Sequence, residues 1–171
     1  MLPRTTRRSL LGAGLLLGFA RPGRAQDLAA PAGRVILSIT GKIARRNSPD
    51  AAQFDLPMLE ALGPESFTTT TPWHNGPVTF EGVPMARLLR EVGANGTTLQ
   101  VLALNDYSTE IPIEDFEKYP VVLAYKRDGA YMPVRDKGPL FIVYPYDSDP
   151  TLKHQRFYSR SAWQVARMIV K

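Results

Sequence analysis

Alternating apolar and polar positions dominate the chain after residue 33. This alternation, together with short β-branched or apolar runs, predicts strands over 35–41, 67–71, 98–104, 108–113, 121–127, 140–144 and 163–169. The strand over 121–127 is expected to turn back at Asp128-Gly129, a dipeptide favoured in tight hairpins. The strand over 140–144 consists of large apolar and aromatic residues, which is typical of a buried strand.

Helical spacing occurs in two short stretches. Asp55 is expected to cap a short helix whose apolar side includes Met58 and Leu59, and Gly63 stops it. A second helix is predicted over 84–92, where proline fits the first turn and an apolar stripe faces the core. Internal repeats and heptads are absent from the sequence, so the pattern predicts the α+β class.

The length and composition suit one domain. A chain of 171 residues with 44% hydrophobic residues is long enough for a single core and too short for a second sizeable one. We expect the domain to span 34–171, preceded by an Ala/Pro/Gly-rich flexible lead over 26–33. The chain has no cysteine, which excludes disulfides, zinc–thiolate and iron–sulfur sites, c-type haem attachment and a lipid anchor.

Residues 1–25 carry the features of an export signal. A basic start is followed by an uncharged apolar run over 10–20, which is too short to span a bilayer as a mature helix. The pair Arg7-Arg8 resembles the twin-arginine signal, and adjacent arginines also occur in general secretory signals. Small residues before Gln26 predict cleavage there. We therefore expect a periplasmic protein with no membrane span in the mature chain.

Removal of this segment changes the charge of the protein. Residues 1–25 contain five arginines and no acidic residue, out of 21 basic and 16 acidic residues in the whole chain. Cleavage leaves 16 basic against 16 acidic residues, so the mature net charge is about zero. The basic isoelectric point therefore gives no reason to expect nucleic acid or an anionic membrane surface as a partner.

Two long stretches carry motifs that occur together in one enzyme family. In chain order they are Trp73-His74-Asn75-Gly76, Gly82-Val83-Pro84, Asn105-Asp106-Tyr107, Leu123-Ala124-Tyr125, Asp128-Gly129, Met132-Pro133, the segment 135–140 and Tyr144-Pro145. They resemble the molybdopterin-binding domain of the sulfite oxidase family, over most of the chain after residue 33. The resemblance implies a single-domain, mixed-sheet α+β fold and a molybdopterin cofactor, which in that family performs oxygen-atom transfer.

The resemblance also implies where the metal would lie. It places the family's molybdenum-ligating cysteine near Thr69, within a residue or two. A thiolate is a soft, easily ionised ligand, whereas a threonine hydroxyl is a hard oxygen and barely acidic. His74 and His154 are far apart in the sequence and have no ligand spacing. We therefore assign no residue as a metal ligand.

Cofactor contacts follow from the same resemblance. Thr69 and the loop residues Trp73, His74 and Asn75 are expected to contact the cofactor, because loops after strands carry binding sites. From residue type alone, Trp73 is more typical of a partly buried packing residue, and His74 of a surface or capping group.

A short acidic-aromatic segment supplies the implied catalytic group. The resemblance implies that Asp106 accepts a hydrogen bond from a pterin N–H and that Tyr107 approaches the substrate as the catalytic residue. The alternative from residue type is a turn, since asparagine and aspartate favour turns and tyrosine suits the next strand.

A basic segment supplies the implied phosphate contacts. The resemblance implies that Arg135, Lys137 and Gly138 receive the pterin phosphate: arginine offers a planar fork, lysine a point charge, and glycine a close approach of the backbone. Without the resemblance, the same segment is a charged turn before a buried strand.

Two functions are compatible with this sequence. The first is an extracytoplasmic, molybdopterin-dependent oxidoreductase with altered metal ligation, acting on a small-molecule substrate with a periplasmic redox partner. The second is a non-catalytic periplasmic module on the same fold that binds a small ligand or a signalling partner protein. The missing cysteine favours the second function, whereas the segments around Tyr107 and Arg135 favour the first.

Overall fold

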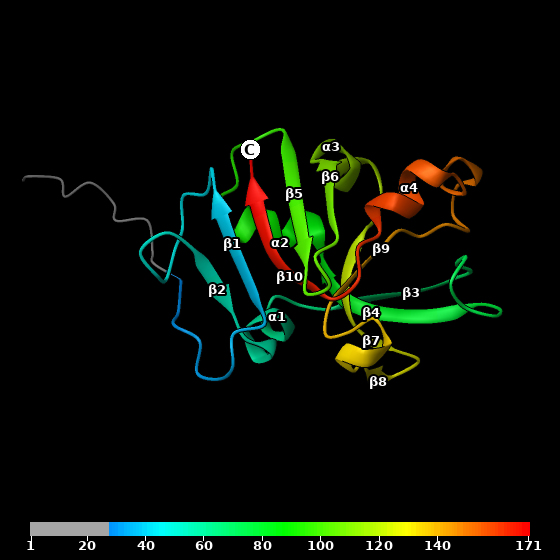
Figure 1. The fold of residues 1–171 in the computed structure, drawn as a ribbon, viewed down its shortest axis with the longest axis horizontal. Helices are drawn as coiled ribbons and strands as arrows, with labels where there is room; N and C mark the ends of the chain where they lie inside the picture. Colours follow the sequence, from blue (N-terminus) through cyan, green and yellow to red (C-terminus); the bar gives the residue numbers. More distant parts are fainter. Residues whose placement is uncertain (1–27) are drawn as a thin grey trace, which may run out of the picture.

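The computed structural model describes residues 28–171 and contains two β-sheets (Figure 1). The first sheet has five strands in the spatial order β2 (Ala52–Phe54), β1 (Leu37–Gly41), β10 (Val165–Val170), β5 (Thr98–Ala103) and β6 (Ser108–Pro112). β1 and β10 are parallel and the other pairs are antiparallel, so this sheet is mixed.

The second sheet is antiparallel throughout. Its strands follow the order β3 (Glu65–Thr69), β4 (Val78–Pro84), β7 (Val122–Arg127) and β8 (Ala130–Tyr131), and β9 (Phe141–Val143) also pairs with β7. Figure 1 shows β3 and β4 extending away from the first sheet, beneath the segment that carries α4. The loops at the ends of these strands are where sites are commonly built.

Short helices connect and cover the sheets. The α-helices are α1 (Leu56–Ala61), α2 (Met85–Glu91), α3 (Glu114–Lys118) and α4 (Gln155–Arg160), and the 3₁₀ turns are η1 (Val134–Asp136) and η2 (Pro150–Leu152). α2 lies behind the first sheet in Figure 1 and buries Met85, Leu88 and Leu89. The prediction of the α+β class with a mixed sheet is confirmed.

Asp55 begins α1 as the sequence predicted. Its carboxylate accepts hydrogen bonds from the Met58 backbone N–H at 3.0 Å and from the N–H groups of Ala32 at 2.9 Å and Gly33 at 2.7 Å. These backbone N–H groups lower the pKa of Asp55, with that of Gly33 first among them. Within the segment predicted as a flexible lead, Leu28 is buried and Asp55 fastens residues 32–33 to α1; residues 1–27, including the predicted signal, lie outside the described residues.

The predicted strands match β1, β3, β5, β6, β7, β9 and β10 to within a few residues. β4 was not predicted, although it is central in its sheet, because its alternation shifts at a register break between Glu81 and Gly82. A Cβ at Gly82 would overlap the Leu123 carbonyl, so glycine is required where the two strands approach closely. α3 and α4 were also missed, because at five and six residues they are too short for an apolar period to show.

The alternation predicted over 163–169 is broken in the structure. The register of β10 against β5 shifts between Val165 and Arg167, as in a β-bulge. Beyond the shift, Met168 and Val170 are buried, whereas strict alternation from Val165 would bury Ile169. One extra residue therefore changes which side chains face the core.

A buried ion pair joins α3 to α4. The Asp115 carboxylate accepts hydrogen bonds from the Arg160 guanidinium at 2.6 Å and from the Tyr144 hydroxyl at 2.7 Å. The Arg160 and Asp115 side chains are only 17% and 9% exposed, so this ion pair is largely withdrawn from solvent. Burial and the contact with Asp115 raise the pKa of Tyr144, which keeps its hydroxyl a donor.

Replacing Arg160 by alanine is expected to lower the free energy of unfolding by about 3 kcal/mol, because it leaves a buried carboxylate without its cation. Urea denaturation monitored by circular dichroism measures this change. The matched control is Lys171→Ala, which removes the exposed pair with Glu110 and should cost less than about 1 kcal/mol. Equal losses in the two variants would contradict the assignment of Arg160 as a structural ion pair.

Candidate functional site

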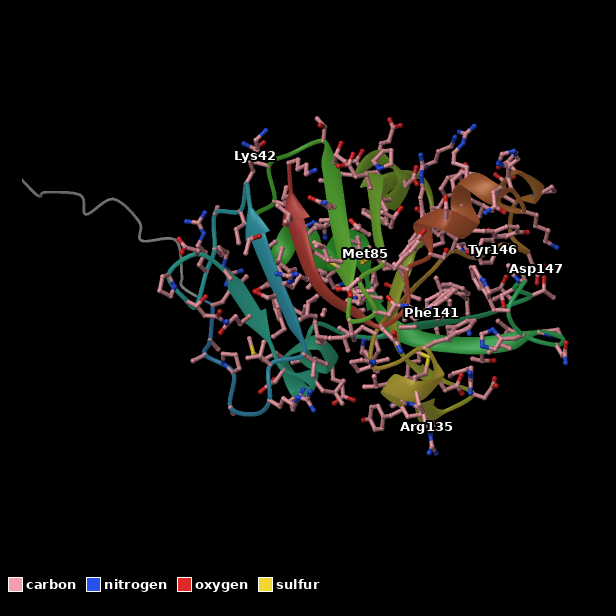
Figure 2. The ribbon with its side chains drawn as sticks, in the orientation of Figure 1. Lys42, Met85, Arg135, Phe141, Tyr146 and Asp147 are labelled. Atoms are coloured by element: carbon pink, nitrogen blue, oxygen red, sulfur yellow. The ribbon has the colours of Figure 1, made fainter. Side chains whose placement is uncertain are left out.

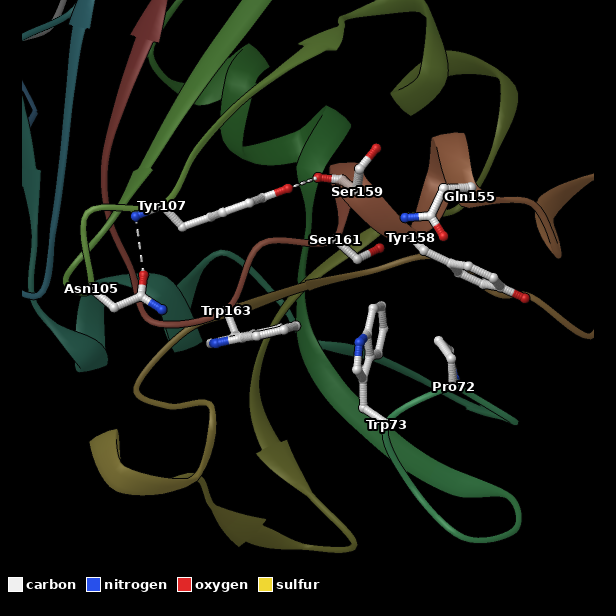
Figure 3. Close-up of a pocket in the computed structure, with 9 residues that line it drawn as sticks. All are labelled: Pro72, Trp73, Asn105, Tyr107, Gln155, Tyr158, Ser159, Ser161 and Trp163. Carbon is white, nitrogen blue, oxygen red and sulfur yellow. Dashed lines mark hydrogen bonds between the residues drawn. The ribbon is translucent and has the colours of Figure 1, made fainter.

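A cavity of about 310 Å³ opens between α4, the β5–β6 turn and the loop that follows β3 (Figure 3). It is lined by Pro72, Trp73, Asn105, Tyr107, Gln155, Tyr158, Ser159, Ser161 and Trp163. Four of these side chains are aromatic and none carries a formal charge at neutral pH. A concave, mostly apolar cavity with a few polar groups is the usual form of a small-molecule site.

Trp73 is held in the wall of the cavity by other aromatic rings. Its ring centroid lies 5.6 Å from those of Phe141 and Trp163 and 6.0 Å from that of Tyr158, all in edge-to-face geometry. Such contacts stabilise beyond simple burial, by roughly 0.5–1.5 kcal/mol each. The Trp73 ring is therefore both a packing residue and part of the cavity wall.

Tyr107 crosses the cavity from the opposite side. Asp106 takes a left-handed conformation (φ 64°), and the Asn105 side-chain oxygen accepts a hydrogen bond from the Tyr107 N–H at 3.2 Å. This turn directs the tyrosine toward α4, where its hydroxyl donates to the Ser159 carbonyl at 2.6 Å (Figure 3). Asp106 itself is exposed and does not line the cavity.

His74 anchors the loop that carries Trp73. Its Nε2 lies 3.2 Å from the Arg127 guanidinium, and its Nδ1 lies 2.8 Å from the Thr71 hydroxyl. Arginine can only donate, so Nε2 accepts and Nδ1 carries the hydrogen, which it donates to Thr71. Arg127 is in turn paired with Asp136 at 2.6 Å. Burial, followed by the charges of Arg127 and Lys137, lowers the pKa of His74.

This arrangement predicts acid sensitivity at one histidine. The folded protein favours neutral His74, whereas the unfolded chain takes up a proton near pH 6.5, so stability is complete above about pH 7 and falls as the pH drops through 6.5 toward the lower folded pKa. His74→Gln keeps an acceptor for Arg127 and removes the titration. Urea midpoints from pH 7.5 to 5 should fall less steeply for this variant than for the wild type, and parallel curves would sink the assignment.

The threonines around the position of the implied metal ligand all have hydrogen-bond partners. Thr69, only 1% exposed, accepts from the Asp147 N–H at 3.1 Å, and the Thr70 hydroxyl donates to the Asp147 carboxylate at 2.6 Å. The Thr68 hydroxyl pairs with that of Thr79 at 2.7 Å, and the Thr71 hydroxyl contacts His74. Lys153 and then Thr70 hold the pKa of Asp147 well below its usual range. The hydrogen bonds of Thr69 and Thr70 to Asp147 hold the end of β3 against the loop around Asp147, which is labelled in Figure 2.

The predicted phosphate-binding residues lie outside the cavity lining. Arg135 is exposed on η1 at the edge of the molecule (Figure 2). The Lys137 ammonium lies 4.9 Å from the centroid of the Trp163 ring, and Lys137 is not among the lining residues. Asn75 is exposed in the loop after Trp73. Among the predicted site residues, the structure therefore brings Trp73 and Tyr107 together at the cavity, with Lys137 beside it.

Gly138 has a backbone role that the structure makes explicit. A Cβ at this position would overlap the Met132 carbonyl, and the Gly138 N–H donates to the Pro133 carbonyl at 3.0 Å. The glycine thus permits the η1 turn to close on itself before β9 begins.

Gly138→Ala is expected to destabilise the fold by about 3 kcal/mol, because backbone must move to admit the methyl group. Gly129→Ala is the control: its added Cβ meets no atom within 4 Å, so only the left-handed conformation (φ 80°) is strained, at about 1 kcal/mol. Chemical denaturation compares the two. If the Gly138 variant kept wild-type stability, the glycine would serve something other than this close approach.

Several lining residues were not predicted from the sequence. Gln155, Tyr158 and Ser159 lie on α4, and Trp163 follows it. The sequence signal that could have indicated them is the concentration of aromatic residues over 157–163. The helix that carries these residues is capped by His154, whose Nδ1 accepts a hydrogen bond from the Arg156 N–H. Asn105 was noted only as part of a motif, and its place in the cavity depends on the turn at Asp106.

The fold and the cavity define a two-sheet α+β domain with an aromatic cavity between α4, the β5–β6 turn and the loop after β3. Residues 58–147 match the family described as oxidoreductase molybdopterin binding domain, and the chain belongs to that family. The resemblance to the sulfite oxidase type of this domain is therefore confirmed, and α4 lies beyond the matched residues. No curated protein matches the chain.

The family description connects this domain with molybdopterin. The residues present in this chain do not fit a molybdopterin cofactor with a protein-ligated metal. The chain has no cysteine, and each hydroxyl of the threonine run is already hydrogen-bonded. No cationic side chain lines the cavity to receive a phosphate. Across residues 28–171, no group of three or more His, Cys, Asp or Glu side chains is placed to hold a metal ion. In the same residues, no helix has the length and apolar character to cross a membrane.

Proposed function

We propose that this protein is an exported, non-catalytic member of the molybdopterin-binding oxidoreductase domain family that binds a small organic molecule in its aromatic cavity. The observation that carries the proposal is the contrast between an intact cavity and an absent metal ligand: Trp73, Tyr107 and Trp163 line the cavity, while Thr69 is buried and engaged with Asp147. Binding of this kind needs neither a thiolate nor a phosphate clamp.

The exported location is part of the proposal. It rests on the basic and apolar pattern of residues 1–25, with the Arg7-Arg8 pair, and places the mature domain in the periplasm. A periplasmic ligand-binding module acts through another protein that recognises its ligand-bound or ligand-free form, so a signalling partner protein belongs to the same proposal.

The family match favours a second candidate, a molybdopterin-dependent oxidoreductase with unusual ligation. In that case the cofactor would be held without a protein sulfur, and Tyr107, which reaches the cavity, would face the substrate. The lack of lining cations weighs against this candidate, because a pterin phosphate would have to enter the cavity without a counter-charge.

The two candidates are separated by the contents of the mature protein. Protein purified from the periplasm of a host that makes the cofactor is expected to contain neither molybdenum, by elemental mass spectrometry, nor pterin, by fluorescence after oxidation. Native mass spectrometry is expected to show a non-covalent mass excess that disappears on denaturation, and Trp163→Leu is expected to reduce it.

Thr69→Cys is the matched variant for the metal. Its side chain would lie in the buried position that contacts the Asp147 backbone, so molybdenum is expected to stay near zero. Near-stoichiometric molybdenum and pterin in the wild-type protein would overturn the proposal and establish the oxidoreductase.

A further inference from the structure

The chemistry of the cavity lining identifies the class of ligand, if the cavity is the ligand site that the proposed function requires. Figure 3 shows the Tyr107 ring on one side of the cavity and the Trp163 ring on the other, with the Trp73 ring beside Trp163. Opposed aromatic rings leave a slot that a flat molecule fills with the greatest contact. The first requirement on the ligand is therefore a planar ring.

The volume limits the size of that ring. Small-molecule sites commonly enclose roughly 300–1,000 Å³, and about 310 Å³ lies at the lower end of this range. The hydrogen bond from the Tyr107 hydroxyl to the Ser159 carbonyl, at 2.6 Å, ties the tyrosine to α4. A ligand of one or two fused rings fits this space, and a dinucleotide-sized molecule does not.

The charges around the slot exclude ionic ligands. Clusters of aromatic rings bind cations in other proteins. Two observations weigh against a cationic ligand here: no carboxylate lines the cavity, and the Lys137 ammonium lies 4.9 Å from the centroid of the Trp163 ring. Because this ammonium lies so close to the Trp163 ring, its positive charge opposes a cation placed on the same ring. An anion is equally unsupported, because the lining contains no arginine or lysine.

The polar groups of the lining are neutral and several are unused. Within residues 28–171, the Gln155 amide, the Asn105 side-chain N–H group and the indole N–H groups of Trp73 and Trp163 make no hydrogen bond to another protein group, and both amide side chains are exposed. Most of these groups are donors, so they match acceptor atoms on a ligand. The hydroxyls of Ser159 and Ser161, by contrast, already donate to backbone carbonyls at 2.9 Å.

We propose that the cavity binds an uncharged, planar heteroaromatic molecule of one or two rings, inserted between Tyr107 and Trp163. Its carbonyl or ring-nitrogen acceptors face Asn105 and Gln155 at the rim, and its flat surfaces contact the two aromatic side chains. Affinity comes from ring stacking and burial, and orientation comes from the two amides.

Isothermal titration calorimetry with quinazoline-2,4-dione as the probe tests this proposal. This probe is flat, neutral and carries two carbonyl acceptors. The comparison compounds are the same ring bearing a carboxylate, the same ring bearing a trimethylammonium group, and a saturated bicyclic imide of similar size. We expect the neutral ring to bind at least about tenfold more tightly than each of the three.

Variants locate the binding within the slot. Tyr107→Leu and Trp163→Leu are expected to weaken the neutral ring about tenfold, whereas Tyr107→Phe keeps the ring and should stay within about threefold. Gln155→Ala, on the exposed side of α4, removes a rim amide without touching the core and should weaken binding several-fold. Tyr131→Leu is the matched control, because this exposed tyrosine on β8 lies outside the cavity. Circular dichroism verifies that each variant is folded.

Any of three results would overturn the inference. A charged or saturated compound could bind more tightly than the neutral ring, the neutral ring could fail to bind, or its affinity could be unchanged in the Tyr107, Trp163 and Gln155 variants. These outcomes are distinct from failure of the proposed function. If native mass spectrometry still finds a ligand that Trp163→Leu removes, the binding function stands and only the ligand class is wrong. Stoichiometric molybdenum and pterin would instead remove the proposed function itself.

Discussion

The pairing of the chain around Phe141 with the chain around Trp163 is the interaction on which the rest of the structure depends. Phe141 and Trp163 form an isolated bridge, the Ile142 N–H donates to the Ala162 carbonyl at 2.9 Å, and the Val165 N–H donates to the Leu140 carbonyl at 3.0 Å. β9 belongs to the second sheet and β10 to the first, so these few bonds join the two sheets. They also place Trp163 against Trp73 and thereby build one wall of the cavity.

Around this junction, polar groups are used to fasten segments together. Asp115 joins α3 to α4, Asp147 joins the end of β3 to the loop before η2, and His74 joins the Trp73 loop to β7 through Arg127. Each of these groups has specific partners, and the buried Asp115 and half-buried His74 require them. The consequence for function is that the threonines at the implied metal position are committed to the fold. The cavity beside them is left with neutral donors and aromatic rings.

The family membership and the chemistry of this chain therefore point in different directions. A family match over residues 58–147 includes the threonine run, the turn at Asp106 and the segment around Arg135. The match reports a shared fold, and a shared fold accommodates different sites. α4, which supplies Gln155, Tyr158 and Ser159 to the cavity, lies outside the matched residues. The residues that distinguish this site are thus partly those that the family does not define.

The sequence by itself determined the local structure: the cap at Asp55, the apolar stripe of α2, most of the strands and the family. These features depend on neighbouring residues, whose propensity and period are visible in the sequence. Two kinds of feature were decided only by the tertiary structure. Bulges at Gly82 and Val165 changed which side chains face inward, because one extra residue reverses the alternation of a strand.

The composition of the site was the other feature that the tertiary structure decided. Trp73, Tyr107 and Trp163 are distant in the sequence and meet only after the sheets are joined, so no local pattern ranks them above Arg135 or Asp106. The family resemblance implied that Arg135 is a phosphate ligand, and its exposed place on η1 follows from a turn that closes at Gly138. Residue type sets what a side chain is able to do; the long-range packing of this fold decided which side chains share a cavity.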